Sequence, residues 1–235
     1  MKRFFLLSIV LLLAYGGVQA QAMKTKKPSK NTETVDGRAT GGSLKIAESI
    51  PLPEPHKGLE VPLQQVLKHR QTVREFREEE LSVEVLSSLL WCTYGFNRPE
   101  EAKRVVPSAV NCQEYDIYVF TREGVYLYDA KSHSLGRVTE GDHRSLISKQ
   151  KFFGVAPVSI VLVANYDRMK MFKETADRDF YAAADCGYIS QNIYLFCSAA
   201  ELGSVACGGI NREGIHKLLG IKNGRAMLAH PVGMK

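Results

Sequence analysis

Two segments between residues 60 and 95 repeat apolar residues with the spacing of an amphipathic helix. Residues 60–69 contain four such positions, and a stronger repeat runs from Ser82 to Tyr94. Ser82 is a residue type that caps helix N-termini, and Gly95 is a natural stop. We therefore predict one helix within residues 60–69 and a second one between Ser82 and Gly95.

The middle of the chain alternates apolar and polar residues with the period of two that marks β-strands. Residues 115–121 alternate in this way, a turn follows at residues 122–124, and residues 125–128 resume the pattern. The pair predicts a β-hairpin. Residues 158–164 are almost wholly apolar and rich in β-branched side chains, which is typical of a strand buried on both faces.

The C-terminal third returns to helical spacing. The longest predicted helix runs from Asp179 to Leu202 and ends at Gly203, and a short one follows Asn211. A last strand is expected at residues 226–232. Because helices precede, interrupt and follow the strands, the pattern predicts an α+β domain.

The N-terminal residues have the pattern of an export signal. Residues 1–20 combine two basic residues, an apolar run of 12 residues from Phe4 to Tyr15, and small residues suited to cleavage after Ala20 or Ala22. A transmembrane helix needs about 20 apolar residues. We expect a signal peptide, with an uncleaved N-terminal anchor as the alternative. The protein is then periplasmic or extracellular, with no stable membrane span after cleavage.

The rest of the chain divides at a change of composition. Residues 21–58 are polar, basic and interrupted by prolines, which predicts a linker or N-terminal arm with little capacity to form a core. Residues 59–235 then form the folded domain. The whole chain has 235 residues, of which 45% are hydrophobic and 24% charged, so it is neither disordered nor a small disulfide scaffold. Its formal net charge of +6 does not point to a nucleic-acid partner.

Common catalytic motifs are absent from the sequence. It contains no G-x-S-x-G, H-E-x-x-H, C-x-x-C or P-loop, and its six histidines lack the spacing of metal ligands. We assign no metal site and no catalytic acid or base. The five cysteines are interpreted mainly as small buried residues, and one disulfide among Cys92, Cys112 and Cys207 remains open.

Three segments have residue types suited to ligand binding. Arg70, Thr72 and Arg74 can hold a phosphate monoester, although an exposed basic helix end has the same pattern. Residues 107–113 carry two carboxamides that can recognise a heterocycle edge, or form an ordinary turn. Gly208 and Gly209 allow close approach of a planar ligand, or simply follow a helix end.

Taken in order along the chain, these segments resemble the motifs of a known family. From Arg70 to Gly233 the chain resembles the FMN-dependent nitroreductase family, and within it most closely the thiazole/oxazole-forming peptide dehydrogenases. The matching motifs are Arg70-x-Thr72-x-Arg74-x-Phe76, Pro107-Ser108-Ala109-x-Asn111-x-Gln113, Gly124-Val-Tyr126-Leu-Tyr128, Asp185-Cys-Gly187-x-x-x-Gln191-Asn192-x-x-Leu195, Leu202-Gly203, Gly208-Gly209 and Pro231-Val232-Gly233.

The resemblance implies a central mixed β-sheet flanked by helices, with the long helix at the core of a homodimer interface. It implies FMN bound between the two chains. Arg70 and Thr72 would then hold the phosphate and ribityl chain, and Arg74 would approach the flavin pyrimidine. Pro107 and Ser108 would contact FMN from the partner chain. The other implied contacts are Asn111 at the pyrimidine edge and a backbone N–H of Gly208 or Gly209 at flavin N5.

The implied activity is ping-pong hydride transfer from NAD(P)H through flavin N5 to a nitro, quinone or other conjugated acceptor, or oxidation of a heterocycle. The cofactor carries the chemistry and the protein positions it. Two features depart from the family pattern. Glu114-Tyr115 follows Gln113, where the family often has Pro-Trp. Many members also carry a basic residue after the Pro-Val-Gly strand that pairs with the phosphate. Here Lys235, two residues after Gly233, would take that role, with the C-terminal carboxylate as an unfavourable neighbour.

Two alternative functions remain. Export and the short C-terminal tail are compatible with a flavin-binding protein that has no nicotinamide turnover. A non-flavin interaction protein on the same fold is the other alternative. An electron donor other than NAD(P)H also fits export, because NAD(P)H is scarce outside the cell.

Overall fold

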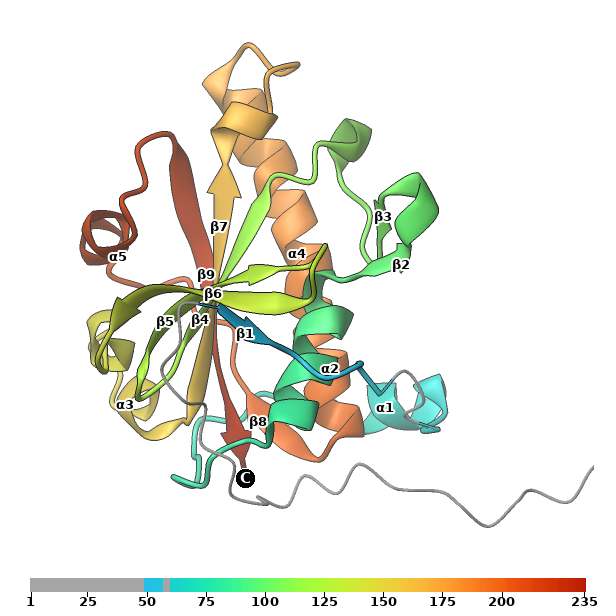
Figure 1. Ribbon diagram of the computed structural model, residues 1–235, viewed down its shortest axis with the longest axis vertical. Helices are drawn as coiled ribbons and strands as arrows, with labels where there is room; N and C mark the ends of the chain where they lie inside the picture. The colour runs from blue at the N-terminus through green and yellow to red at the C-terminus, as the bar shows by residue number, and fades with distance from the viewer. Residues whose placement is uncertain (1–48, 57–59) are drawn as a thin grey trace, which may run out of the picture. The chain divides into compact units, whose positions relative to one another are not determined.

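The computed structural model describes residues 49–56 and 60–235 (Figure 1). The predicted signal peptide and most of the predicted linker lie outside the described residues. A seven-stranded sheet has the strand order β1-β6-β5-β4-β7-β9-β8, and every neighbouring pair is antiparallel. Its strands are β1 Ser49–Pro51, β4 Tyr115–Phe120, β5 Gly124–Asp129, β6 Ser134–Glu140, β7 Val158–Asn165, β8 Leu202–Ser204 and β9 Gly224–Met234. Strands β2 Phe96–Arg98 and β3 Lys103–Arg104 pair separately.

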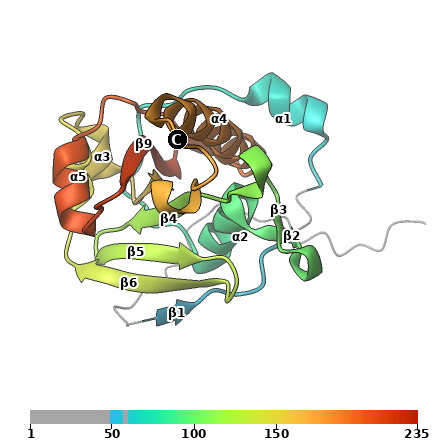
Figure 2. The same cartoon turned by 90° about the horizontal axis from the view of Figure 1, so that it is seen from above.

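Helices cover both faces of the sheet, which confirms the α+β class. In Figures 1 and 2, α2 and α4 lie on one side, and α3 and α5 on the other. The helices are α1 Leu63–His69, α2 Val83–Tyr94, α3 Phe152–Val155, α4 Thr175–Ala199 and α5 Arg212–Leu219. Four short 3-10 turns are η1 Pro99–Glu101, η2 Ala109–Asn111, η3 Arg144–Leu146 and η4 Tyr166–Arg168.

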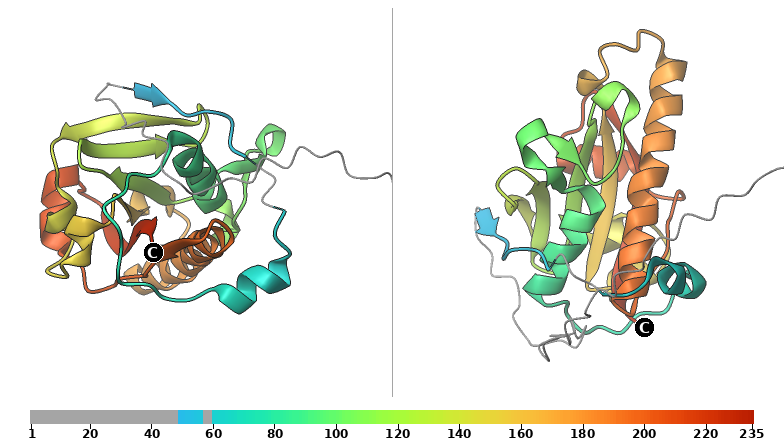
Figure 3. Two further views of the ribbon diagram at one scale, coloured as in Figure 1. Left: turned by 90° about the horizontal axis from the view of Figure 1, so that it is seen from below. Right: turned by 90° about the vertical axis from the view of Figure 1, so that its right-hand side faces the viewer.

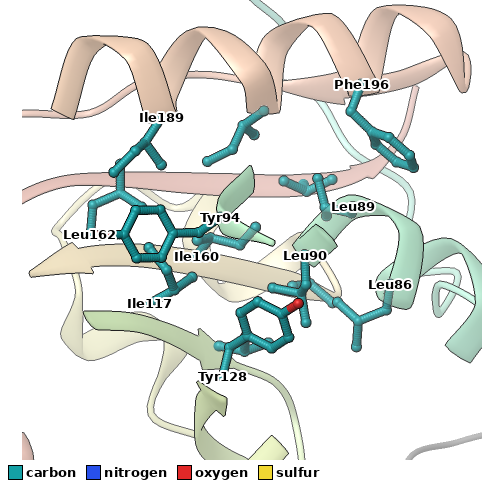
Figure 4. Packing of buried hydrophobic residues seen from close by; sticks show 14 of the residues in the cluster. Leu86, Leu89, Leu90, Tyr94, Ile117, Tyr128, Ile160, Leu162, Ile189 and Phe196 are labelled. Carbon is teal, nitrogen blue, oxygen red and sulfur yellow. The ribbon is translucent and has the colours of Figure 1, made fainter. Parts of the chain in front are cut away.

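The alternation of side chains along β7 creates two separate cores. Ile160 and Leu162 face the cluster that includes α2 and α4, whereas Val161 and Val163 face the cluster beneath α3 and α5. All four are fully or almost fully buried. Figure 4 shows the first cluster, where leucines of α2 meet side chains of α4 over the sheet. The predicted strand with two buried faces is therefore confirmed.

Local signals placed most helix ends correctly. The Ser82 hydroxyl accepts a hydrogen bond from the Val85 N–H at 3.3 Å, as expected of a cap. Gly220 ends α5 in the left-handed conformation, with φ of 66°. The long helix differs from its prediction at both ends, because α4 begins four residues earlier and ends at Ala199. Its C-terminal side stops because Glu201 takes a positive φ of 59° and the chain then enters β8.

Strands β1, β2, β3, β6 and β8 were not predicted, and β1 and β6 form one margin of the main sheet. Residues 49–51 were assigned to the polar arm, but they pair with β6, and Leu52 is buried in the main core. The folded domain therefore starts before the predicted boundary at residue 59. Strand β6 occupies a stretch for which no element was predicted, and its only buried apolar side chain is Leu135. Both strands have too few apolar positions to show the alternating pattern.

All five cysteines are free thiols, which closes the disulfide question for Cys92, Cys112 and Cys207. Cys186, Cys197 and Cys207 are buried. Among the residues described, no helix is both long and apolar enough to cross a bilayer. Within the same residues, no group of three or more His, Cys, Asp or Glu side chains is arranged to hold a metal ion.

Candidate functional site

The segment that carries Arg70, Thr72 and Arg74 runs along β8 and the end of β9, at one edge of the sheet. The Val73 N–H donates to the Ser204 carbonyl at 2.9 Å, and the Arg77 N–H donates to the Met234 carbonyl at 3.0 Å. Gly203 makes this approach possible, because a Cβ there would lie 2.7 Å from a methyl of Val73. Gly203, predicted as a helix stop, therefore serves instead as a close packing point.

Tyr194 of α4 connects this segment to the one before the glycine pair. Its hydroxyl accepts the Ala206 N–H at 2.8 Å and lies 3.3 Å from Thr72 Oγ1. The Arg70 guanidinium lies 5.3 Å from the centroid of its ring. Sequence reasoning missed Tyr194, because a tyrosine in the helical pattern gives no sign of which distant segments it contacts.

Arg70 and Lys235 line the same cavity of about 740 Å³, between α1, the C-terminal end of α4 and the end of β9. Ser198 fixes α1 in place by donating a hydrogen bond to the Val66 carbonyl at 2.8 Å. Figure 3 shows α1 and the C-terminus beside the same end of α4. The side chains that line this cavity include five basic ones and one carboxylate, Glu201: Lys68, His69, Arg70, Arg77 and Lys235. The terminal carboxylate of Lys235 lies at the same place. The cavity therefore favours an anion.

The glycine pair follows a short bridge to β9. Cys207 and Ala229 exchange backbone hydrogen bonds of 2.9 and 3.0 Å. Gly208 and Gly209 are both exposed, and a Cβ at Gly209 would meet nothing within 4 Å. Burial raises the pKa of the Cys207 thiol, while the positive charge of nearby Arg74 opposes this rise. The charge of Arg74 therefore acts on the residue that precedes the glycine pair.

The predicted residues Pro107, Ser108 and Asn111 lie elsewhere on the chain. Their segment is held by α4, because the Ala109 N–H donates to Asp185 Oδ2 at 2.8 Å. Asp185 and Tyr194 are nine residues apart on that helix, a separation of about 13 Å. One chain therefore brings together Arg70, Thr72, Arg74, the glycine pair and Lys235, and leaves residues 107–111 apart from them.

Backbone strain is concentrated in this second segment. Val110, Asn111 and Gln113 all have positive φ, of 43°, 58° and 48°. A β-branched residue in that region is a genuine outlier. The Ser108 hydroxyl accepts the Gln113 N–H at 3.1 Å, and the Gln113 amide donates to Asn111 Oδ1 at 3.2 Å. These bonds fix the two carboxamides that the sequence singled out.

A pair of carboxyl groups lies beneath the same segment. Glu114 is fully buried and Asp185 almost so, and among the described residues neither carboxyl oxygen of Glu114 has a hydrogen-bond partner. Burial raises the pKa of Glu114, and repulsion from Asp185 raises it further. Burial also raises the pKa of Asp185, against the opposing effect of the Ala109 N–H. The pair favours one shared proton over two charges. Sequence reasoning noted Glu114 only as a departure from the family motif.

A buried histidine packs behind Tyr194, the residue that connects the Arg70 segment to the glycine pair. His230 of β9 has Nε2 at 2.9 Å from Ser190 Oγ and Nδ1 at 3.1 Å from Ser204 Oγ. Its ring packs edge-on against Tyr194, with the ring centroids 5.4 Å apart. Burial lowers its pKa to about 3, so the ring is neutral at physiological pH. Nothing in the sequence around His230 indicates partners 40 and 26 residues away.

Comparison with known proteins gives one consistent result. The model of the nitroreductase family matches residues 67–234. A candidate nitroreductase of Methanocaldococcus jannaschii is 34% identical over 187 residues, which cover 75% of this chain and 92% of that protein. The crystal structure of a candidate nitroreductase from Ralstonia eutropha has a TM-score of 0.76 and 34% identity, covering 80% of this chain and 90% of that one. The fold is also that of the NADPH:FMN oxidoreductase of Vibrio harveyi complexed with NAD⁺, with a TM-score of 0.54, 17% identity, and coverage of 73% and 68%.

Proposed function

Because the chain belongs to the nitroreductase family, we propose that it is an FMN-dependent oxidoreductase. Its acceptor would be a nitro, quinone or other conjugated compound. Oxidation of a heterocycle, as in the thiazole/oxazole-forming dehydrogenases, is the variant suggested by the closest motif resemblance. The observation that carries the proposal is the convergence of Arg70, Thr72, Arg74 and the glycine pair at one end of α4.

The residues at this end of α4 fit FMN. The phosphate needs a basic site of sufficient volume, and the cavity of about 740 Å³ with Arg70 and Lys235 provides one. The ring needs an open surface that backbone can approach, and Gly209 has nothing within 4 Å of where a Cβ would stand. Arg70 and Lys235 would bind the phosphate, and the Thr72 hydroxyl the adjoining chain. Lys235 would then pair with the phosphate, as a basic residue after the Pro-Val-Gly strand does in many members of the family.

When bound, FMN would supply two-electron chemistry, accepting hydride from NAD(P)H or another donor and passing the electrons to the acceptor. The protein's own part is to bind and orient. Arg74 would place a positive charge beside the pyrimidine side of the ring. Tyr194 fixes Thr72, and His230 packs behind Tyr194 as a neutral side chain, so no further charge is placed behind the site.

We also propose a homodimer that completes this site. Residues 107–111 lie too far along α4 to reach the Arg70 cavity of their own chain, so a second chain would have to supply them. The exposed face of α4 is suited to such contact. It carries Phe180 at 68% exposure, Tyr188 at 50%, and Gly187, where a Cβ would meet nothing within 4 Å. Gly187→Arg should therefore convert a dimer to a monomer, as measured by light scattering.

The assignment of residues 1–20 as a signal peptide remains a proposal, since these residues lie outside those described. Export predicts that the mature chain begins at Gln21 or Met23. N-terminal sequencing of protein from the periplasmic or secreted fraction tests it. A cytoplasmic chain that retains Met1 would contradict export and leave the flavin proposal intact.

The visible absorption spectrum tests the flavin proposal. We expect a band near 450 nm (the usual oxidised-flavin position) after reconstitution with FMN, and bleaching when NADPH or NADH is added without oxygen. Arg70→Ala should weaken FMN binding by about tenfold or more, because it removes charge-assisted hydrogen bonds. Lys222→Ala, an exposed lysine outside the cavity, is the matched control. A protein that stays colourless with excess FMN would refute the proposal, and a band that no nicotinamide bleaches would indicate another donor or simple flavin binding.

A further inference from the structure

A second large cavity, of about 780 Å³, lies at the far end of the sheet from the Arg70 cavity. The two share no lining residue. The second cavity is an open depression bordered by the end of α2, strands β3, β5 and β6, and the segment at residues 111–113. Tyr94, Tyr115, Tyr128 and Leu127 are among its lining residues, and the three tyrosines are almost fully buried, so only a small part of each ring faces the cavity. A flat ligand can lie against such a surface.

Arg104 lines this cavity in a fixed orientation. Its Nε donates to Gln113 Oε1 at 2.8 Å, and its Nη1 donates to the Tyr94 carbonyl at 2.7 Å. The guanidinium carbon lies 3.9 Å from the centroid of the Tyr94 ring and 4.3 Å from that of Phe96. Two hydrogen bonds and two aromatic contacts therefore hold the guanidinium before any ligand arrives.

Within the part of the chain that the structure describes, Arg104 forms no ion pair, and Asp116 acts on its charge only from a distance. Its hydrogen-bond partners are neutral, no carboxylate lies within 4 Å, and Nη2 has no protein acceptor. Burial lowers the pKa of Arg104, as expected for a cation partly removed from water. A ligand anion would reduce this cost.

The other charged side chains of the cavity are already neutralised or bonded. Arg168 pairs with Asp116 at 2.5 Å, and Arg137 pairs with Glu140 at 2.6 Å. Asp129 accepts hydrogen bonds from the Lys131 N–H and the Ser132 hydroxyl. Among the described residues that line the cavity, Arg104 is therefore the only cation without a carboxylate partner, and Asp129 is a carboxylate held by neutral donors. One such cation matches a monoanion, and a planar guanidinium matches a carboxylate.

We propose that this cavity binds a planar monocarboxylate, with Arg104 as its counter-ion. In the setting of the proposed function, on which this step rests, the ligand is the electron acceptor. The reason is that Asn111, which lines the cavity, belongs to the segment expected at the flavin. Arg104 then determines specificity for acceptors that carry a carboxylate on the same ring as the group that is reduced.

Turnover of two matched acceptors, with NADPH as the electron donor, tests this specificity in the FMN-loaded protein. The probes are 4-nitrobenzoate and 4-nitrobenzamide, which differ in charge and little in shape. We expect kcat/KM to favour the carboxylate, and Arg104→Gln to lower kcat/KM for 4-nitrobenzoate by about tenfold or more while changing that for the amide little. Arg137→Gln, whose guanidinium is bound to Glu140, should leave the preference unchanged. Equal losses on both probes in Arg104→Gln would overturn the proposal.

A binding measurement separates this proposal from the proposed function. Titration of the purified protein with 4-fluorobenzoate and 4-fluorobenzamide, followed by ¹⁹F NMR, requires no turnover. Tighter binding of the carboxylate that is lost in Arg104→Gln supports the cavity assignment even if no nitro compound is reduced. Equal binding of the two probes overturns it even if flavin chemistry is confirmed. If Arg104→Gln fails to fold, the wild-type comparison and Arg104→Lys, which keeps the charge, decide the question.

Discussion

The buried histidine of β9 makes a quantitative prediction about acid stability. His230 is fully buried between Ser190 and Ser204, and burial lowers its pKa from 6.5 to about 3. Between these two values the unfolded chain binds a proton that the folded chain does not. The stabilisation from neutral His230 is therefore complete above pH 6.5 and is lost as the pH falls below it.

The size of the effect follows from the two pKa values. Each pH unit within this window changes the free energy of unfolding by about 1.4 kcal/mol. Integrated from pH 7 to pH 5, the contribution of His230 falls by about 2 kcal/mol. A folded-state pKa one unit higher would change this figure little, because pH 5 would still lie above it.

Glu114 acts in the opposite direction over part of the same range. Burial and repulsion from Asp185 raise its pKa, so the folded chain holds a proton that the unfolded chain has released. Stability from this group is present at low pH and is lost as the pH rises through the folded pKa. The two groups partly cancel in the wild type, and the contribution of His230 appears only by comparison with a variant.

The assay is urea unfolding of wild type and His230→Gln at pH 7, 6 and 5. Glutamine can bond to both serines but does not titrate. We expect the variant to gain about 2 kcal/mol relative to the wild type between pH 7 and pH 5, whatever its stability at pH 7. His143→Gln, in the loop after β6, is the control and should track the wild type. Parallel curves for wild type and His230→Gln would refute the reasoning, as would an NMR titration of His230 with a midpoint above pH 5.

Three further variants test other features. Glu114→Gln should gain stability over the wild type as the pH rises from 6 to 8, whereas exposed Glu100→Gln should not; equal pH profiles in urea unfolding would contradict a buried proton at Glu114. Val110→Gly should raise the free energy of unfolding by about 1 kcal/mol, because it removes a strained positive φ at a cost in unfolded-state entropy. A lower melting temperature would show that the strain estimate is wrong. Gly209→Ala should keep the wild-type melting temperature but bind FMN about tenfold more weakly, and unchanged affinity would place the flavin elsewhere.

Local signals in the sequence were sufficient for much of the fold. The Ser82 cap, the β4–β5 hairpin and the doubly buried β7 each depend on residues within a few positions of one another. The ends of α4 could not be found in this way. Its C-terminal stop depends on Glu201 in a left-handed conformation and on pairing of β8 with β9, which is a contact between distant segments.

In the candidate site, too, residues in local motifs could be predicted, whereas residues positioned by distant contacts could not. The sequence identified Arg70, Thr72, Arg74 and the glycine pair through an ordered motif set, and the fold brings them together. It gave no indication of Tyr194 and His230, which connect these segments through hydrogen bonds and ring packing across many residues. Arg104 was missed for a related reason, since its position depends on aromatic rings of α2 and β2.

The two margins of the sheet share a property that constrains how the protein can associate. Strand β1 pairs with β6 at one margin, and residues 70–77 lie along β8 and the end of β9 at the other. Unpaired strand edges are where sheets of separate molecules extend one another. Because short segments of the same chain cover part of both edges, growth by strand addition is hindered. The second copy of the proposed homodimer would then meet the helical faces, and such a contact closes on itself instead of extending the sheet.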